Sequence, residues 1–248
     1  MDKLVYTALS GLRSQMASQS TIANNIANAS TTGYRAERVN FDRLVLQGQT
    51  FQSRELSSEE VNDFDRRAGT LVQTARPLDV AVAGDSWMAV QAKDGTEAYT
   101  RRGDLNVAAS GVLETGDGFP VMGSGGPITV PPYQSIAIAA DGTLSIVPPG
   151  AQPGQEPQVI DKIKLASPDG SQTAKGLDNL LHVKGGGVLP EDMDGRVQSG
   201  ALEQSNVNLT EALVDMIQNQ RSYEVQANLL KEARTMDESS ASLMRMPA

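Results

Sequence analysis

Apolar residues near the amino terminus recur alternately four and three positions apart. The series consists of Val5, Leu9, Leu12, Met16, Gln19, Ala23 and Ile26, with Gln19 as its one polar member. This spacing is typical of one face of an amphipathic helix. The pattern predicts a helix from about residue 3 to about residue 30, and we expect Gly33 to stop it.

The same alternation returns near the other end of the chain. Its members are Leu209, Leu213, Met216, Gln220, Tyr223, Ala227 and Leu230. Asn208 or Thr210 is expected to cap this second helix, and Glu211 lies near the positive end of its dipole. The hydrophobic pattern therefore predicts one long helix at each end of the chain.

Glycine and proline, which are expelled from helix interiors, are concentrated between these two segments. Asp-Gly pairs, which favour tight hairpin turns, separate short apolar runs in this middle part. The pairs begin at Asp94, Asp117, Asp141, Asp169 and Asp194. This arrangement predicts an antiparallel β domain.

We therefore expect an α+β fold in three parts. Residues 1–35 and 205–248 form a terminal helical core, in which the two long helices pair as an antiparallel, coiled-coil-like rod. Residues 36–74, which are rich in charge, form an exposed connector, and residues 75–204 form the β-rich central domain.

The two helical stripes include apolar positions that a single pair of helices does not cover, and such surface normally marks an interface. Residues 1–33 carry only Asp2, Lys3 and Arg13 as charged side chains, whereas a helix that faces solvent is usually more densely charged. We expect the ends to be weakly ordered in the free subunit and to become helical when copies pack side by side. The alternative is a self-contained helical bundle that caps the β domain.

The residues expected to form the interface between copies lie on these two segments. They are Val5, Leu9, Leu12, Met16, Ile22, Ala23, Asn24, Asn25, Ile26, Leu209, Leu213, Met216, Ile217, Gln220, Tyr223, Ala227 and Leu230.

The composition leaves little room for catalysis. The 30 acidic and 21 basic side chains give a net charge of -9, so we expect neither a nucleic-acid partner nor direct membrane insertion. The chain has no cysteine and a single histidine, which excludes thiolate sites and sites that need two imidazoles. We therefore expect no catalytic residue, no metal site and no cofactor.

Several local motifs have residues that chemical sites also use. The runs 123–126 and 185–187 are glycine-rich, but no phosphate-binding motif follows them, so we expect loops. His182 is expected to be structural, and Asp192 and Asp194 lack the ligand series of a calcium loop. The amino terminus lacks the apolar stretch of a secretory signal, and no apolar run has transmembrane length, which indicates a cytosolic chain or one exported without a cleaved signal.

Three regions of the chain carry a family signature. The first is the run IANNIANASTTGY at residues 22–34. The second comprises GTLVQTARPLDVAVAG at residues 69–84 and AYTRRGD at residues 98–104, and the third comprises SNVNL at residues 205–209 and QRSYE at residues 220–224. Together these runs resemble the flagellar rod, hook and hook-associated axial proteins, and the resemblance spans nearly the whole chain. Residues 1–8 and the short length are most similar to the proximal-rod members.

This resemblance implies a structural subunit of the flagellar basal-body rod, which crosses the periplasm as a torque-transmitting drive shaft. It implies helical polymerisation through the terminal helices, with copies of itself and other proximal and distal rod proteins as partners. It also implies passage through the flagellar type III export apparatus as an unfolded chain. The alternatives are a distal-rod or other axial sibling, and a cell-wall hydrolase, for which no carboxylate pair stands out.

Overall fold

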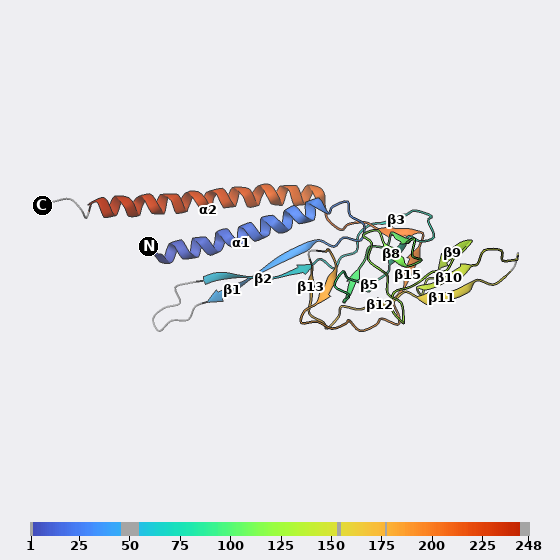
Figure 1. Ribbon diagram of the computed structural model, residues 1–248. Helices are drawn as coiled ribbons and strands as arrows, with labels where there is room; N and C mark the ends of the chain where they lie inside the picture. The colour runs from blue at the N-terminus through green and yellow to red at the C-terminus, as the bar shows by residue number, and fades with distance from the viewer. Residues whose placement is uncertain (1, 46–54, 153–154, 177, 244–248) are drawn as a thin grey trace. The chain divides into compact units, whose positions relative to one another are not determined.

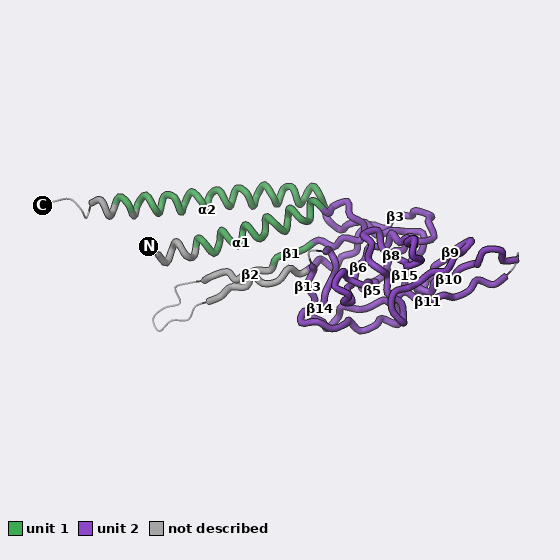
Figure 2. Tube along the Cα trace, viewed as in Figure 1, with its two compact units in different colours: residues 1–27, 37–62, 208–248 green, residues 28–36, 63–207 purple. Residues whose placement is uncertain are grey.

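The computed structural model describes the backbone of residues 2–45, 55–152, 155–176 and 178–243, and the side chains of residues 8–39, 64–152, 155–176, 178–236 and 238–239. It divides into two compact units (Figure 2). The first contains residues 1–27, 37–62 and 208–248, and the second contains residues 28–36 and 63–207. The described residues form two helices and a strand-rich central region, which confirms the predicted α+β class.

The first unit contains both helices and a two-stranded sheet (Figure 1). Helix α1 spans Asp2–Ala27 and helix α2 spans Leu209–Leu243. Of the two candidate caps, Asn208 is the one used: its side-chain oxygen accepts hydrogen bonds from the backbone N–H groups of Thr210 and Glu211, at 3.1 and 3.3 Å. This side chain satisfies amides that the first turn of a helix otherwise leaves unpaired.

Strands β1 and β2 lie in the region that sequence reasoning treated as a connector. Strand β1 spans Glu37–Val45 and β2 spans Glu55–Phe64. Residues 46–54 of the same region lie outside the described residues. The division of the chain into a helical core, a connector and a β domain stays a prediction.

The second unit is built from short strands. They are β3 (Leu71–Gln73), β4 (Val80–Val82), β5 (Trp87–Gln91), β6 (Glu97–Thr100), β7 (Leu105–Val107), β8 (Leu113–Thr115), β9 (Ser135–Ile138), β10 (Thr143–Val147), β11 (Gln158–Lys162), β12 (Leu165–Ala166), β13 (Thr173–Lys175), β14 (Leu181–Val183), β15 (Val197–Ser199) and β16 (Ala201–Glu203).

These strands pair antiparallel in several small sheets. The largest has the order β12-β5-β6-β14-β13, and a second has the order β11-β10-β9. Strands β15 and β16 pair with β4 and β3, so the end of the unit is joined to its beginning. Two of the predicted Asp-Gly turns join strands that pair with each other: one lies between β5 and β6, and the other lies between β9 and β10. In these turns Gly95 and Gly142 have φ angles of 85° and 87°. Glycine adopts these positive φ angles without the strain of a side chain.

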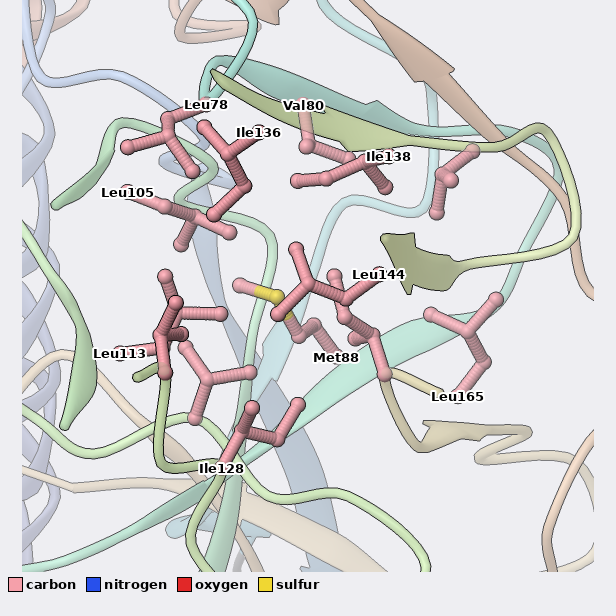
Figure 3. Close-up of a cluster of buried hydrophobic side chains, with 14 of the residues drawn as sticks. Leu78, Val80, Met88, Leu105, Leu113, Ile128, Ile136, Ile138, Leu144 and Leu165 are labelled. Carbon is pink, nitrogen blue, oxygen red and sulfur yellow. The ribbon is translucent and has the colours of Figure 1, made fainter. Parts of the chain in front are cut away.

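The main core of the second unit gathers apolar side chains from along its whole length (Figure 3). Met88, Leu105, Leu113 and Leu144 are each 0% exposed, and they come from different strands. Leu78 and Val197, which lie near opposite ends of the unit in sequence, belong to the same cluster. The second unit therefore buries a contiguous core of its own.

Candidate assembly interface

One side of α1 is exposed from residue 9 to residue 27. Leu9 is 41% exposed and Met16 is 59% exposed. The exposed residues between positions 8 and 27 recur four and three positions apart: Leu9, Arg13, Met16, Ser20, Ala23 and Ala27. In the single chain this helical stripe is therefore open to solvent.

Helix α2 also exposes large apolar side chains over most of its length. Seven of them are between 45% and 60% exposed: Leu209, Leu213, Val214, Ile217, Val225, Leu229 and Met236. Isolated exposed apolar residues are ordinary, but a helix that shows them over several turns is typical of an element that packs against another molecule.

The described residues between the two helices are mostly polar. A groove between α1 and α2 is lined by Ser14, Gln15, Ser18, Ile22, Asp215, Gln218, Asn219 and Ser222. Further along, Gly11 lies against Gln226, since a Cβ on this glycine would be 3.2 Å from the Gln226 Oε1 atom. The walls of this groove are therefore mostly polar.

The structure divides the predicted interface residues into two groups by exposure. The exposed ones are Leu9, Met16, Ala23, Leu209, Leu213, Ile217 and Gln220, and the partly buried ones are Leu12, Ile22, Asn24, Asn25, Ile26, Met216, Tyr223, Ala227 and Leu230. The remaining one, Val5, belongs to α1, but its side chain lies outside the described residues. Which of them touch a neighbouring copy stays a prediction.

Two of the predicted interface residues, Asn24 and Asn25, have bonds within the first unit. The Asn25 side chain accepts from the Glu37 N–H at 2.8 Å and donates to the Glu37 carbonyl at 2.9 Å. The Asn24 amide nitrogen donates to the Glu37 carboxylate at 2.9 Å. These asparagines therefore hold the start of β1 against the end of α1.

Gly33 was expected to stop the first helix. The helix ends at Ala27, six positions earlier, and Gly33 lies in a turn of the second unit with a φ angle of 69°. Its N–H donates to the Glu203 carbonyl at 2.7 Å, and a Cβ at this position would lie 2.4 Å from backbone atoms of Arg101. Close approach of two backbones and a positive φ angle therefore explain the glycine.

Beside Gly33, three buried charged side chains join distant parts of the second unit. The Glu203 carboxylate accepts from Arg35 at 2.7 Å and from the Nε of Arg101 at 2.8 Å. All three side chains are at most 3% exposed. The same carboxylate accepts from the Gly69 N–H at 2.8 Å. The sequence patterns did not predict this cluster, and the only signal was that Arg101 lies within one family run and Arg35 and Glu203 lie just outside two others.

Other donors of the two arginines bind backbone carbonyls, while the buried Nε of Arg35 has no partner among the described residues. Arg101 donates to the carbonyls of Val82, Gly84 and Ser86, and Arg35 donates to those of Arg66 and Arg67. Burial lowers the pKa of Arg35 to about 10, with Arg101 acting in the same direction and Glu203 opposing it. Arg35 therefore stays protonated at neutral pH, and the cluster carries one net positive charge.

The described residues show no candidate metal centre. They contain no group of three or more histidine, cysteine, aspartate or glutamate side chains placed to hold a metal ion. Their single histidine, His182, lies 3.0 Å from the Asp178 carboxylate. None of the described helices is both apolar and long enough to cross a membrane.

Three family models match the chain. "Flagella basal body rod protein" matches residues 5–35, "Flagellar hook protein FlgE/F/G D1 domain" matches residues 81–146, and "Flagellar basal body rod FlgEFG protein C-terminal" matches residues 198–243. Each match contains one member of the buried charged cluster: Arg35, Arg101 or Glu203.

Curated relatives match over nearly the full length. The chain is 40% identical to the flagellar basal-body rod protein FlgF of Salmonella typhimurium and 39% identical to FlgF of Escherichia coli, with 93% of both chains covered in each case. It is 31% identical to the rod protein FlgG of Bacillus subtilis, with 93% of this chain and 94% of the relative covered.

The chain therefore belongs to the flagellar basal-body rod protein family, and among these relatives it is most similar to FlgF. This confirms the family predicted from the sequence. The chain is a structural subunit of the flagellar basal body, located in its rod.

Proposed function

We propose that this subunit polymerises helically through its terminal helices, with copies of itself and with other rod proteins, to form the proximal part of a torque-transmitting shaft. The observation that carries the proposal is the distribution of burial. Among the described side chains, every buried hydrophobic residue belongs to the second unit. The first unit has exposed apolar stripes instead, and neighbouring subunits provide the apolar surface that these stripes lack.

Within each subunit, we propose that α1 and α2 form an antiparallel two-helix rod. Their opposite directions within the first unit support this pairing (Figure 1). Leu9 and Met16 of α1 and Leu213 and Ile217 of α2 are exposed in the single subunit and are therefore available for other copies. Long interlocked helices distribute a shearing load over many small contacts, which suits a rotating shaft.

The proximal position rests on similarity. The identity of 40% to a FlgF protein exceeds the 31% to a FlgG protein, and this favours a proximal-rod subunit over a distal-rod sibling.

We further propose that the chain is divided into a helical core at residues 1–35 and 205–248, a connector at residues 36–74 and a β domain at residues 75–204. We also propose that the subunit passes through the flagellar type III export apparatus as an unfolded chain and that it catalyses no reaction.

The proposal predicts that Leu213→Lys blocks incorporation into rods. Leu213 is 45% exposed, so the lysine is tolerated in the free subunit, but it places a charge in an apolar contact between copies. The measurement is the amount of the chain in isolated basal bodies, together with swimming motility. We expect a drop of at least about tenfold, equivalent to about 1.4 kcal/mol of assembly free energy.

Val188→Lys is the matched control. Val188 is 62% exposed and lies in the second unit, outside both helices, so this lysine is expected to leave incorporation unchanged. Normal basal bodies and motility with Leu213→Lys contradict the role of the α2 stripe.

A further inference from the structure

The groove between α1 and α2 is rich in hydrogen-bond acceptors that have no donor. The Oε1 atom of Gln15 and the Oδ1 atom of Asn219 are buried and unpaired within the part of the chain that the structure describes. Both residues line the groove. A buried acceptor without a donor is destabilising, so these two oxygens are under-satisfied in the single subunit.

Asp215 adds a negative charge to the same groove. Its carboxylate lines the groove and forms no ion pair among the described residues. Two orphaned amide oxygens and one carboxylate together define the chemistry of the missing partner. A guanidinium suits it best, because this group offers several donors in a planar fork and keeps its charge when it leaves water.

The exposed stripe of α1 carries one guanidinium. Arg13 is exposed, is the only charged residue of the stripe, and forms no ion pair among the described residues. It lies between the exposed side chains of Leu9 and Met16, four positions after one and three before the other. The stripe therefore presents a cation flanked by two large apolar groups on one helical face.

Apolar side chains border the groove on α2 as well. Val214 precedes Gln218 by four residues, and Val225 follows Ser222 by three, so each lies beside a groove residue on the helix surface. Val214 is 48% exposed and Val225 is 60% exposed. The negative charge of the groove is therefore opposite to that of Arg13 in the stripe, and both surfaces have apolar side chains beside the charge.

We propose that Arg13 of one copy enters the α1–α2 groove of a second copy, where its guanidinium donates to the Asp215 carboxylate and, once the side chains of Gln15 and Asn219 turn toward it, to their amide oxygens. Leu9 and Met16 of the first copy then pack along the α2 border of the groove, which includes Val214 and Val225. The inference rests on the proposed polymerisation and names the contact that carries it.

The contact has a directional consequence. Stripe and groove are different surfaces of the same chain, so each bound copy presents a further stripe and a further groove. A contact between two different surfaces can therefore add one subunit after another in a helical array, as a rod requires. It does not stop at a symmetric dimer.

A charge-reversal series tests the pairing. Arg13→Glu and Asp215→Arg are made singly and together in the full chain, which replaces the natural copy in cells. Each single variant brings like charges together, and we expect each to lower the amount of the chain in basal bodies at least about tenfold. The double variant restores the opposite charges and is expected to return to within about threefold of the natural chain.

Cysteine cross-linking tests the contact directly, because the chain has no cysteine of its own. Arg13→Cys and Asn219→Cys are placed on two copies of different length, which are expressed together. A disulfide that joins the two lengths in basal bodies is the expected result. Arg13→Cys combined with Val188→Cys is the control and is expected to give no such product. Circular dichroism and protein yield verify that each variant folds.

The outcomes separate the inference from the proposed function. If Leu213→Lys blocks incorporation but the double charge reversal is no better than the single ones, the inference is overturned and the proposed function stands. Cross-linking of Arg13→Cys only to other rod proteins overturns it as well. If the natural chain is absent from rods, or if Leu213→Lys is incorporated normally, the proposed function fails and the inference fails with it.

Discussion

At the scale of the residue, Glu203 holds the second unit together. Its carboxylate bonds two buried guanidiniums and a backbone amide that are distant in sequence. Because two positive charges are buried beside one negative charge, the cluster depends on that carboxylate. Removing one partner of a buried ion pair leaves uncompensated charge and usually costs about 3–5 kcal/mol.

We predict that Glu203→Gln destabilises the second unit by about 3–5 kcal/mol, since the neutral amide leaves Arg35 and Arg101 without a counter-charge. Urea unfolding, followed by the fluorescence of Trp87, measures the change in unfolding free energy. Trp87 is the single tryptophan of the chain and lies in a buried cluster of the same unit. Glu156→Gln, at an exposed position of that unit, is the control. Equal stability of the two variants argues against the role of Glu203.

At the scale of the element, each helix carries two kinds of surface. Apolar side chains are exposed on both helices, while polar side chains line the groove between them. Most helical stability in proteins comes from packing of an apolar face, so the serine and amide side chains of the groove add little to the stability of the pair. The orphaned oxygen of Gln226 weakens it further.

We predict that Gln226→Met stabilises the helix pair in the free subunit by about 1 kcal/mol, because methionine has a similar shape and removes the unpaired oxygen. The measurement is the thermal loss of helical circular dichroism in the full chain. Gln220→Met, at an exposed position of the same helix, is expected to change the midpoint little. A Gln226→Met midpoint at or below that of the natural chain refutes the argument.

At the scale of the whole molecule, the two units differ in how they are stabilised. The second unit buries a core whose main cluster extends from Leu78 to Val197. In the first unit, Thr21 is the only described side chain that is buried. Because the first unit removes little apolar area from water, its folded state is only marginally stable. Its helices are therefore expected to unfold locally more readily than the strands of the second unit.

Hydrogen exchange on the free subunit measures this difference. We predict that amides of α1 and α2 exchange at least about a hundredfold faster than those of β5 and β6, and that the helices gain protection in assembled rods. Equal protection from end to end in the free subunit favours the self-contained helical bundle over assembly-coupled ordering.

The sequence by itself determined the local elements and the family. Four-three spacing of apolar residues predicts both helices because helical periodicity is a property of the residues themselves, and the observed helices span Asp2–Ala27 and Leu209–Leu243. Asp-Gly pairs likewise mark turns because glycine's preference for positive φ angles is local. The family could be recognised from the three sequence regions alone, and the family models match segments in the same parts of the chain.

Tertiary structure decided every feature that depends on which distant residues meet. The Glu203 cluster joins positions 35, 101 and 203, and no local pattern pairs them. The strands β1 and β2 escaped detection because their charged sequences show no clear apolar alternation. Periodicity places residues on one side of a helix, but only packing decides which side meets its partner, and here the polar side of α1 and α2 lines their shared groove.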